Sequence, residues 1–147
     1  LVTACAAAGI AAFTGDGINP AVMEGAAEAL KKNSGCGVPT VKPWNMALVE
    51  EKMALAKAAD PIAIAMDIDA AGLPFLKNMT PPAGSKTVEE LRQIVQWAEK
   101  PFILKGIMTV EGARKALDAG AAGRVGACHC QYRYHVSPPF SAAEGRM

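Results

Sequence analysis

Short apolar runs alternate with amphipathic segments along most of the chain. Each run is continuous and too short for a helix, which is typical of parallel strands covered on both faces. The segments between them carry helix start signals: Pro20 suits a first helical position, Asn45 and Thr109 suit caps, and Thr87 with Glu90 forms a capping box. The predicted strands are residues 9–13, 38–41, 62–66 and 102–104, and the predicted helices are residues 21–32, 46–59, 91–100 and 110–120.

This alternation predicts an α/β fold in which right-handed crossovers connect parallel strands. The sequence contains no Gly-rich dinucleotide turn, which favours a (β/α)8 TIM barrel with outer helices over a doubly wound sheet. A complete barrel takes about 250 residues, whereas this chain has 147 and begins with Leu1. We therefore expect a partial barrel and an internal piece of a longer protein, with two open sheet edges.

Composition narrows the classes of partner. The formal net charge is +1 and 51% of the residues are hydrophobic, so nothing indicates a nucleic acid or an anionic membrane surface as partner. The cysteines show neither a disulfide framework nor zinc-like ligand spacing, so we expect free thiols, no metal and a cytoplasmic protein. These cysteines are Cys5, Cys36, Cys128 and Cys130.

A polar residue stands at the end of each predicted strand. Because the carboxyl ends of parallel barrel strands meet at one mouth, these side chains should converge there. A lysine at such a mouth holds an anionic ligand or stabilises negative charge that develops during a reaction. The connection of residues 68–86 is long for its position, and long loops in compact folds are usually functional. The four strand-end residues are Thr14, Lys42, Asp67 and Lys105.

Several stretches carry a family resemblance. "AMDIDAAGLPFLK", "PPAGSKTVEELR" and "KPFILKGIMTVEGARKALDAGAAG" closely resemble the FMN-dependent α-hydroxy-acid oxidising family, which includes relatives of lactate oxidase and glycolate oxidase. "AAFTGDGINPAVME" and "GVPTVKPWNM" are similar to the second and third barrel strands of that family. The resemblance covers residues 1–123, which we take as the central part of an FMN-dependent barrel.

The resemblance implies a reaction and a set of site residues. In the family, FMN sits at the carboxyl mouth of the barrel and accepts hydride from the substrate α-carbon while a histidine takes the hydroxyl proton. Lys105 matches the lysine whose charge stabilises the anionic reduced flavin, and Asp67 matches a polar contact to the flavin ring. Further ring contacts fall near Thr14, Gly15, Thr40 and Lys42. Lys105 and His129 are the candidate catalytic residues.

The resemblance ends after Gly123. The family continues with an apolar strand and then Ser-Asn-His-Gly-Gly-Arg, whereas this chain has "RVGACHCQYRYHVSPPFSAAEGRM". His129 falls on the catalytic histidine, but its neighbours differ, and an apolar strand is not expected to open with Arg124. Residues 124–147 are therefore either a frameshifted, poorly ordered tail or a divergent active site.

The predicted function is FMN-dependent oxidation of a small L-2-hydroxy acid to the 2-oxo acid, by a chain that is incomplete for catalysis. The resemblance implies that segments outside residues 1–123 supply the phosphate site and the substrate-binding arginine, and that the full-length form is a homo-oligomer. Two alternatives stay open. One is another FMN-binding TIM-barrel oxidoreductase or isomerase, and the other is a non-catalytic truncated product.

Overall fold

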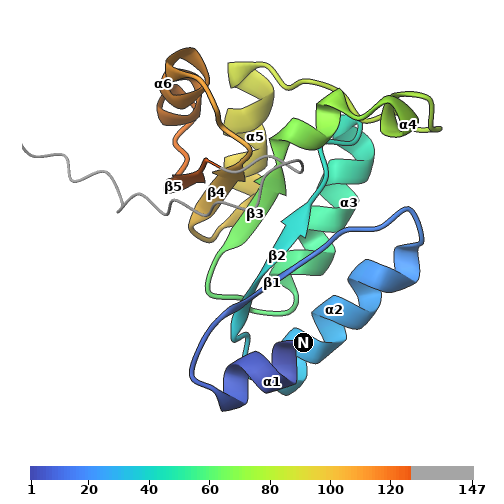
Figure 1. Ribbon diagram of the computed structural model, residues 1–147, viewed down its shortest axis with the longest axis vertical. Coiled ribbons are helices and arrows are strands. Elements are labelled where there is room, and N and C mark those ends of the chain that lie inside the picture. Colours follow the sequence, from blue (N-terminus) through green and yellow to red (C-terminus); the bar gives the residue numbers. More distant parts are fainter. Residues whose placement is uncertain (127–147) are drawn as a thin grey trace, which may run out of the picture.

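Five parallel strands form one sheet in the order in which they occur along the chain (Figure 1). The structure is a computed structural model that describes residues 1–126. Each strand is joined to the next through at least one helix, so the architecture is the predicted α/β fold and is consistent with a partial barrel. The strands are β1 (Ala12–Thr14), β2 (Gly37–Val41), β3 (Ile64–Asp67), β4 (Phe102–Lys105) and β5 (Gly123–Val125).

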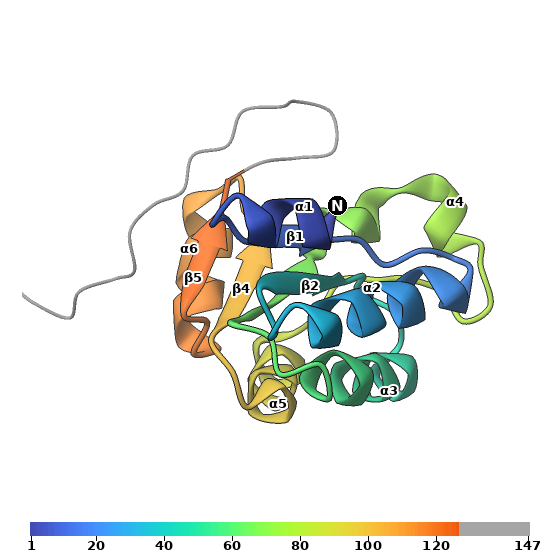
Figure 2. The same ribbon diagram turned by 90° about the horizontal axis from the view of Figure 1, so that it is seen from below.

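Helices cover one face of this sheet. Figure 2 shows α2, α3 and α5 side by side along that face, and α6 lies beside α5. Among the described residues, no helix is long and apolar enough to cross a bilayer. The helices are α1 (Val2–Ala7), α2 (Pro20–Lys32), α3 (Met46–Lys57), α4 (Pro74–Lys77), α5 (Val88–Ala98) and α6 (Val110–Asp118), with a 3-10 helix η1 (Ile68–Gly72) between β3 and α4.

Side chains on both faces of the central strands are buried. The face under the helices carries the larger core, in which Ile64, Met66 and Phe102 are fully or almost fully buried. The opposite face carries a smaller cluster of Val38, Ala63 and Ala65, with Ile103 packed against it. Burial on both faces explains why these strands appear in the sequence as continuous apolar runs.

The predicted helix caps are confirmed. The Asn45 side chain accepts a hydrogen bond from the Leu48 N–H, and the Thr109 side chain accepts one from the Gly112 N–H. Gly120 adopts φ +84°, the left-handed conformation expected after the end of α6. The expectation of a strand over residues 9–13 is only partly right, because β1 begins at Ala12 and the preceding helix α1 was not predicted.

Arg124 lies in a short strand, although an apolar strand was not expected to open at this residue. Residues 123–125 form β5, which pairs in parallel with β4 and aligns Leu104 with Arg124. The Ala122 N–H donates to the Phe102 carbonyl at 2.8 Å, and the Gly106 N–H donates to the Val125 carbonyl at 2.9 Å. The backbone pairing outweighs the weak local strand preference of the segment. Residues 127–147, which hold the rest of the predicted tail, lie outside the described residues.

Replacing Thr87 by Ala should destabilise the fold by about 1 kcal/mol. Thr87 and Glu90 form a reciprocal capping box at the start of α5, in which each side chain accepts a hydrogen bond from the other residue's backbone N–H. Alanine leaves the Glu90 N–H without its partner. Urea unfolding followed by circular dichroism measures the loss. Thr87→Ser keeps the hydroxyl and should stay close to the parent, and an equal loss in both variants would contradict a capping role.

Candidate functional site

A cavity of about 460 Å³ lies at the carboxyl ends of the strands and extends along β1. Its volume falls within the range of ligand pockets in proteins. It is lined by all four predicted strand-end residues and by the two further predicted ring contacts, so the sequence correctly predicted that these side chains would converge. The six predicted residues around the cavity are Thr14, Gly15, Thr40, Lys42, Asp67 and Lys105. Their roles in binding stay predictions.

Lys105 is held by two carboxyl groups. It is the last residue of β4 and lies directly opposite Asp67, the last residue of β3. Its Nζ donates to Asp67 Oδ1, and Asp69 Oδ1 lies 3.7 Å from the same nitrogen. Burial raises the pKa of Asp67, the neighbouring Asp69 side chain raises it further, and the Lys105 ammonium opposes both effects.

Gly106 makes this arrangement possible. Its backbone adopts φ +91°, a conformation that residues other than glycine rarely take. A Cβ at this position would lie 2.5 Å from the Asp69 Cγ, closer than atoms that are not bonded can approach. The glycine that follows Lys105 therefore lets the Asp69 carboxyl lie against the strand end.

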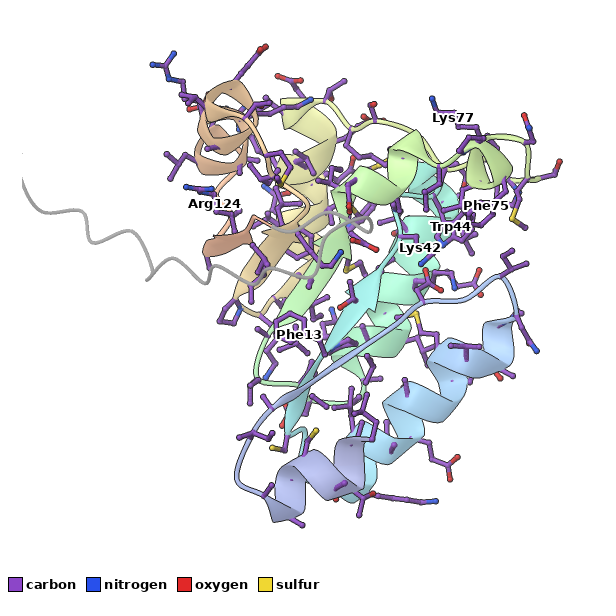
Figure 3. The ribbon with its side chains drawn as sticks, viewed as in Figure 1. Phe13, Lys42, Trp44, Phe75, Lys77 and Arg124 are labelled. Carbon is purple, nitrogen blue, oxygen red and sulfur yellow. The ribbon has the colours of Figure 1, made fainter. Side chains whose placement is uncertain are left out.

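Asp16 organises the neighbouring corner of the site, and sequence reasoning missed it. Its Oδ2 accepts hydrogen bonds from the Trp44 Nε1 at 2.7 Å and from the Lys42 backbone N–H at 3.1 Å. Its Oδ1 accepts from Lys52 Nζ at 2.7 Å, and the Asp16 side chain is fully buried. Figure 3 shows Lys42 and Trp44 close together beyond the end of β2. The local sequence around it, "TGDG" at residues 14–17, indicates a turn and nothing about these partners.

Thr14 is a buried polar residue at the end of β1. Its Oγ1 is buried, and among the described residues no hydrogen-bond partner is recorded for it. Thr14 also lines the cavity at the end of β1. A buried hydroxyl without a partner costs free energy, so Thr14 is a polar residue of the cavity wall whose hydroxyl makes no hydrogen bond within residues 1–126.

The long connection of residues 68–86 contributes less than predicted. None of its residues lines the cavity, although Asp69 at its start reaches Lys105. The end of the connection is anchored next to β2 by Lys86, whose Nζ donates to the Pro43 carbonyl at 3.1 Å. The same Nζ donates to the Gly84 carbonyl at 3.0 Å. Burial lowers the pKa of Lys86. In the described part of the chain, this connection brings Asp69 to Lys105, and any further functional role of it stays a prediction.

His129 and a metal site are the remaining features to consider. His129, the candidate base, lies outside the described residues. Within residues 1–126, no group of three or more histidine, cysteine or acidic residues is placed to hold a metal ion.

Known structures share this fold. No family model and no curated protein matches the chain. A lactate oxidase from Pediococcus acidilactici superposes with a TM-score of 0.60 at 22% identity, over 83% of this chain and 40% of that one. A mandelate oxidase variant in a structure with (S)-mandelic acid gives 0.50 at 19% identity, over 76% of this chain and 46% of that one. A mandelate racemase/muconate lactonizing enzyme from Bordetella bronchiseptica gives a TM-score of 0.58 at 14% identity, over 84% of this chain and 32% of that one.

These similarities define the class of fold. At such identities they establish a common α/β barrel architecture, and the chain spans less than half the length of each of these proteins. The racemase/lactonizing enzyme superposes almost as well as the lactate oxidase, so the fold alone does not separate their chemistries. Any argument for function must come from the residues around the cavity.

Proposed function

We propose that this chain is the central part of an FMN-dependent enzyme that oxidises a small L-2-hydroxy acid to the 2-oxo acid. The observation that carries the proposal is the position of Lys105, which ends β4 beside the cavity in a stretch that resembles the FMN-dependent family. Two of the solved structures with this fold are a lactate oxidase and a mandelate oxidase, and lactate and mandelate are both 2-hydroxy acids.

The cavity residues suit a flavin ring. Phe13 and Val125 supply apolar surface, and Thr14 and Thr40 are polar residues of the same cavity lining. Lys42 and Lys105 bring positive charge to the strand ends. A mostly apolar pocket with a few placed polar groups is the usual form of a cofactor site. When bound, FMN would supply the capacity to accept hydride.

Lys105 is the residue to which we assign the main electrostatic role. Its side chain is 20% exposed and is fixed by the carboxyl groups of Asp67 and Asp69. An ammonium group held in this way does not have to reorganise when negative charge appears beside it, which makes its stabilisation effective. Asp67 limits the movement of Lys105, and Asp16 fixes the backbone of Lys42.

The remaining parts of the reaction stay proposals about the whole protein. His129 is the proposed base, and the phosphate site and the substrate-binding arginine are proposed to lie outside residues 1–123. A small 2-hydroxy acid is the proposed substrate, and a cytoplasmic homo-oligomer is the proposed full-length form.

Lumiflavin, which is the flavin ring without ribityl phosphate, should bind this chain with an affinity similar to that of FMN. The reason is that the described cavity offers ring contacts, while the phosphate contacts are proposed to lie elsewhere. Quenching of flavin fluorescence measures both affinities. Thr40 lines the cavity and is aligned with Ala65, whose side chain lies on the sheet face away from the helices. Thr40→Val removes its hydroxyl with little change in shape and should weaken lumiflavin binding about fivefold, the value of one net hydrogen bond of about 1 kcal/mol.

Thr80→Val is the matched control, since Thr80 is exposed and does not line the cavity. It should leave the affinity unchanged. If the parent chain quenches neither flavin, the ring site is absent and the non-catalytic alternative is favoured.

A further inference from the structure

The cluster at the ends of β3 and β4 holds two carboxyl groups and one ammonium group. The side chains of Asp67, Asp69 and Lys105 are 7%, 16% and 20% exposed. With both carboxyls ionised, the cluster would carry a net charge of −1 in a largely buried place. Burying an excess charge is costly, and a group in this situation usually takes up a proton instead.

The proximity of the two carboxyl groups has the same consequence. Asp67 Oδ1 and Asp69 Oδ1 both lie within 4 Å of the Lys105 Nζ, so the two carboxyl groups share one ammonium group. Two ionised carboxylates in one place repel each other, and they can hydrogen-bond to each other only if one of them carries a proton, because ionised carboxylates only accept. Two carboxyls that share a site lose their protons in separate steps, because the first negative charge opposes the second.

We infer that Asp67 and Asp69 hold one proton between them over a pH range in which an ordinary aspartate is ionised. We further infer that Asp69 is thereby a positioning residue that keeps the charge of Lys105 available to an anionic ligand. The identity of that ligand rests on the proposed function, whereas the shared proton does not.

The charged groups around the cluster determine how anion binding at the cavity mouth should depend on pH. Lys42 from β2 lines the same cavity, and Lys77 from α4 is exposed and points outward (Figure 3). Asp16 also lines the cavity, but Lys52 pairs with it. With one proton on the pair, the Asp67–Asp69–Lys105 cluster is neutral and Lys42 leaves the mouth positive. As the pH rises and that proton leaves, the mouth gains a negative charge and anions should bind more weakly.

The first test is a pH titration of the aspartate side-chain carboxyl carbons by NMR in the 147-residue chain without ligand. In the parent, the carboxyl chemical shifts of Asp67 and Asp69 should change together in one titration step. This common step should lie at a pH above the range in which an ordinary aspartate titrates. Asp69→Asn removes one charge and offers an amide donor to Asp67, so the Asp67 step should move down. Gly106→Ala, which displaces the Asp69 carboxyl, should move it in the same direction.

Asp118→Asn is the control, since Asp118 is exposed on α6 and does not line the cavity. It should leave the Asp67 step where it is. An Asp67 that titrates at or below the ordinary aspartate range in the parent would overturn the inference. So would an Asp67 step that Asp69→Asn does not move.

The second test uses oxalate as the anionic probe and follows the Lys105 side-chain resonances. Above the common step, the parent should lose oxalate affinity by up to about tenfold per pH unit, because one proton is linked to binding. Asp69→Asn should show no such dependence. Failure of oxalate to bind at any pH would overturn the role of the pair toward Lys105. A chain that shows the shared proton yet binds no flavin would refute the proposed function and leave the shared proton standing.

Discussion

Lys105→Met should slow reduction of flavin bound at this site by about a hundred- to a thousand-fold, in a chain that carries the rest of the barrel. The ammonium group meets little charge on oxidised flavin and a full negative charge once hydride has arrived, so its loss affects the reaction more than binding. Removing one such preorganised stabiliser typically costs about 3 to 4 kcal/mol. Single-turnover stopped flow measures the rate, and substrate affinity should change much less.

Lys57→Met is the matched control for this prediction. Lys57 ends α3 and pairs with Glu99, away from the cavity, and both side chains are at least one-third exposed. Its replacement should leave the reduction rate close to that of the parent. If Lys105→Met reduces its flavin as fast as the parent, Lys105 is only the structural end of a strand.

Asp16→Ala should destabilise the fold by about 3 to 5 kcal/mol, a large share of the stability of a typical domain. The substitution leaves Lys52, whose side chain is 10% exposed, without its carboxylate. It also removes the acceptor for the Trp44 Nε1 and for the Lys42 N–H. Guanidinium unfolding followed by circular dichroism and tryptophan fluorescence measures the loss.

A second substitution separates the two parts of that loss. In Asp16→Ala/Lys52→Met, no unpaired charge remains, so the part of the loss that comes from the unpaired Lys52 should be regained. About 1 to 3 kcal/mol should stay lost because the Trp44 and Lys42 donors still have no acceptor. Glu28→Ala, which breaks a pair exposed on both sides, should cause no measurable change. A double variant that is no more stable than Asp16→Ala would contradict the ion-pair explanation.

The sequence determined the features that depend on short-range signals. Capping residues and apolar runs located α2, α3, α5 and α6 and the three central strands, because these signals act within a few residues. It also determined the convergence of Thr14, Lys42, Asp67 and Lys105. Each is the last residue of a strand or directly follows one, and parallel strands place their carboxyl ends on the same side.

Features that depend on long-range pairing escaped the sequence analysis. Residues 123–125 have little strand preference of their own, and they form β5 because their backbone pairs with that of β4. Asp16 is bonded to residues 26, 28 and 36 positions further along the chain. Nothing near "TGDG" specifies those partners.

Asp67 and Lys105 show which features the local sequence specifies and which features only the tertiary structure decides. The sequence alone placed each of them at a strand end, and only the tertiary structure decided that they meet. The register of β3 and β4 aligns the two residues, and the glycine after Lys105 admits Asp69 to the same place. Side-chain charge and strand position are properties of local sequence, whereas distance, burial and proton sharing arise only when separate segments pack together.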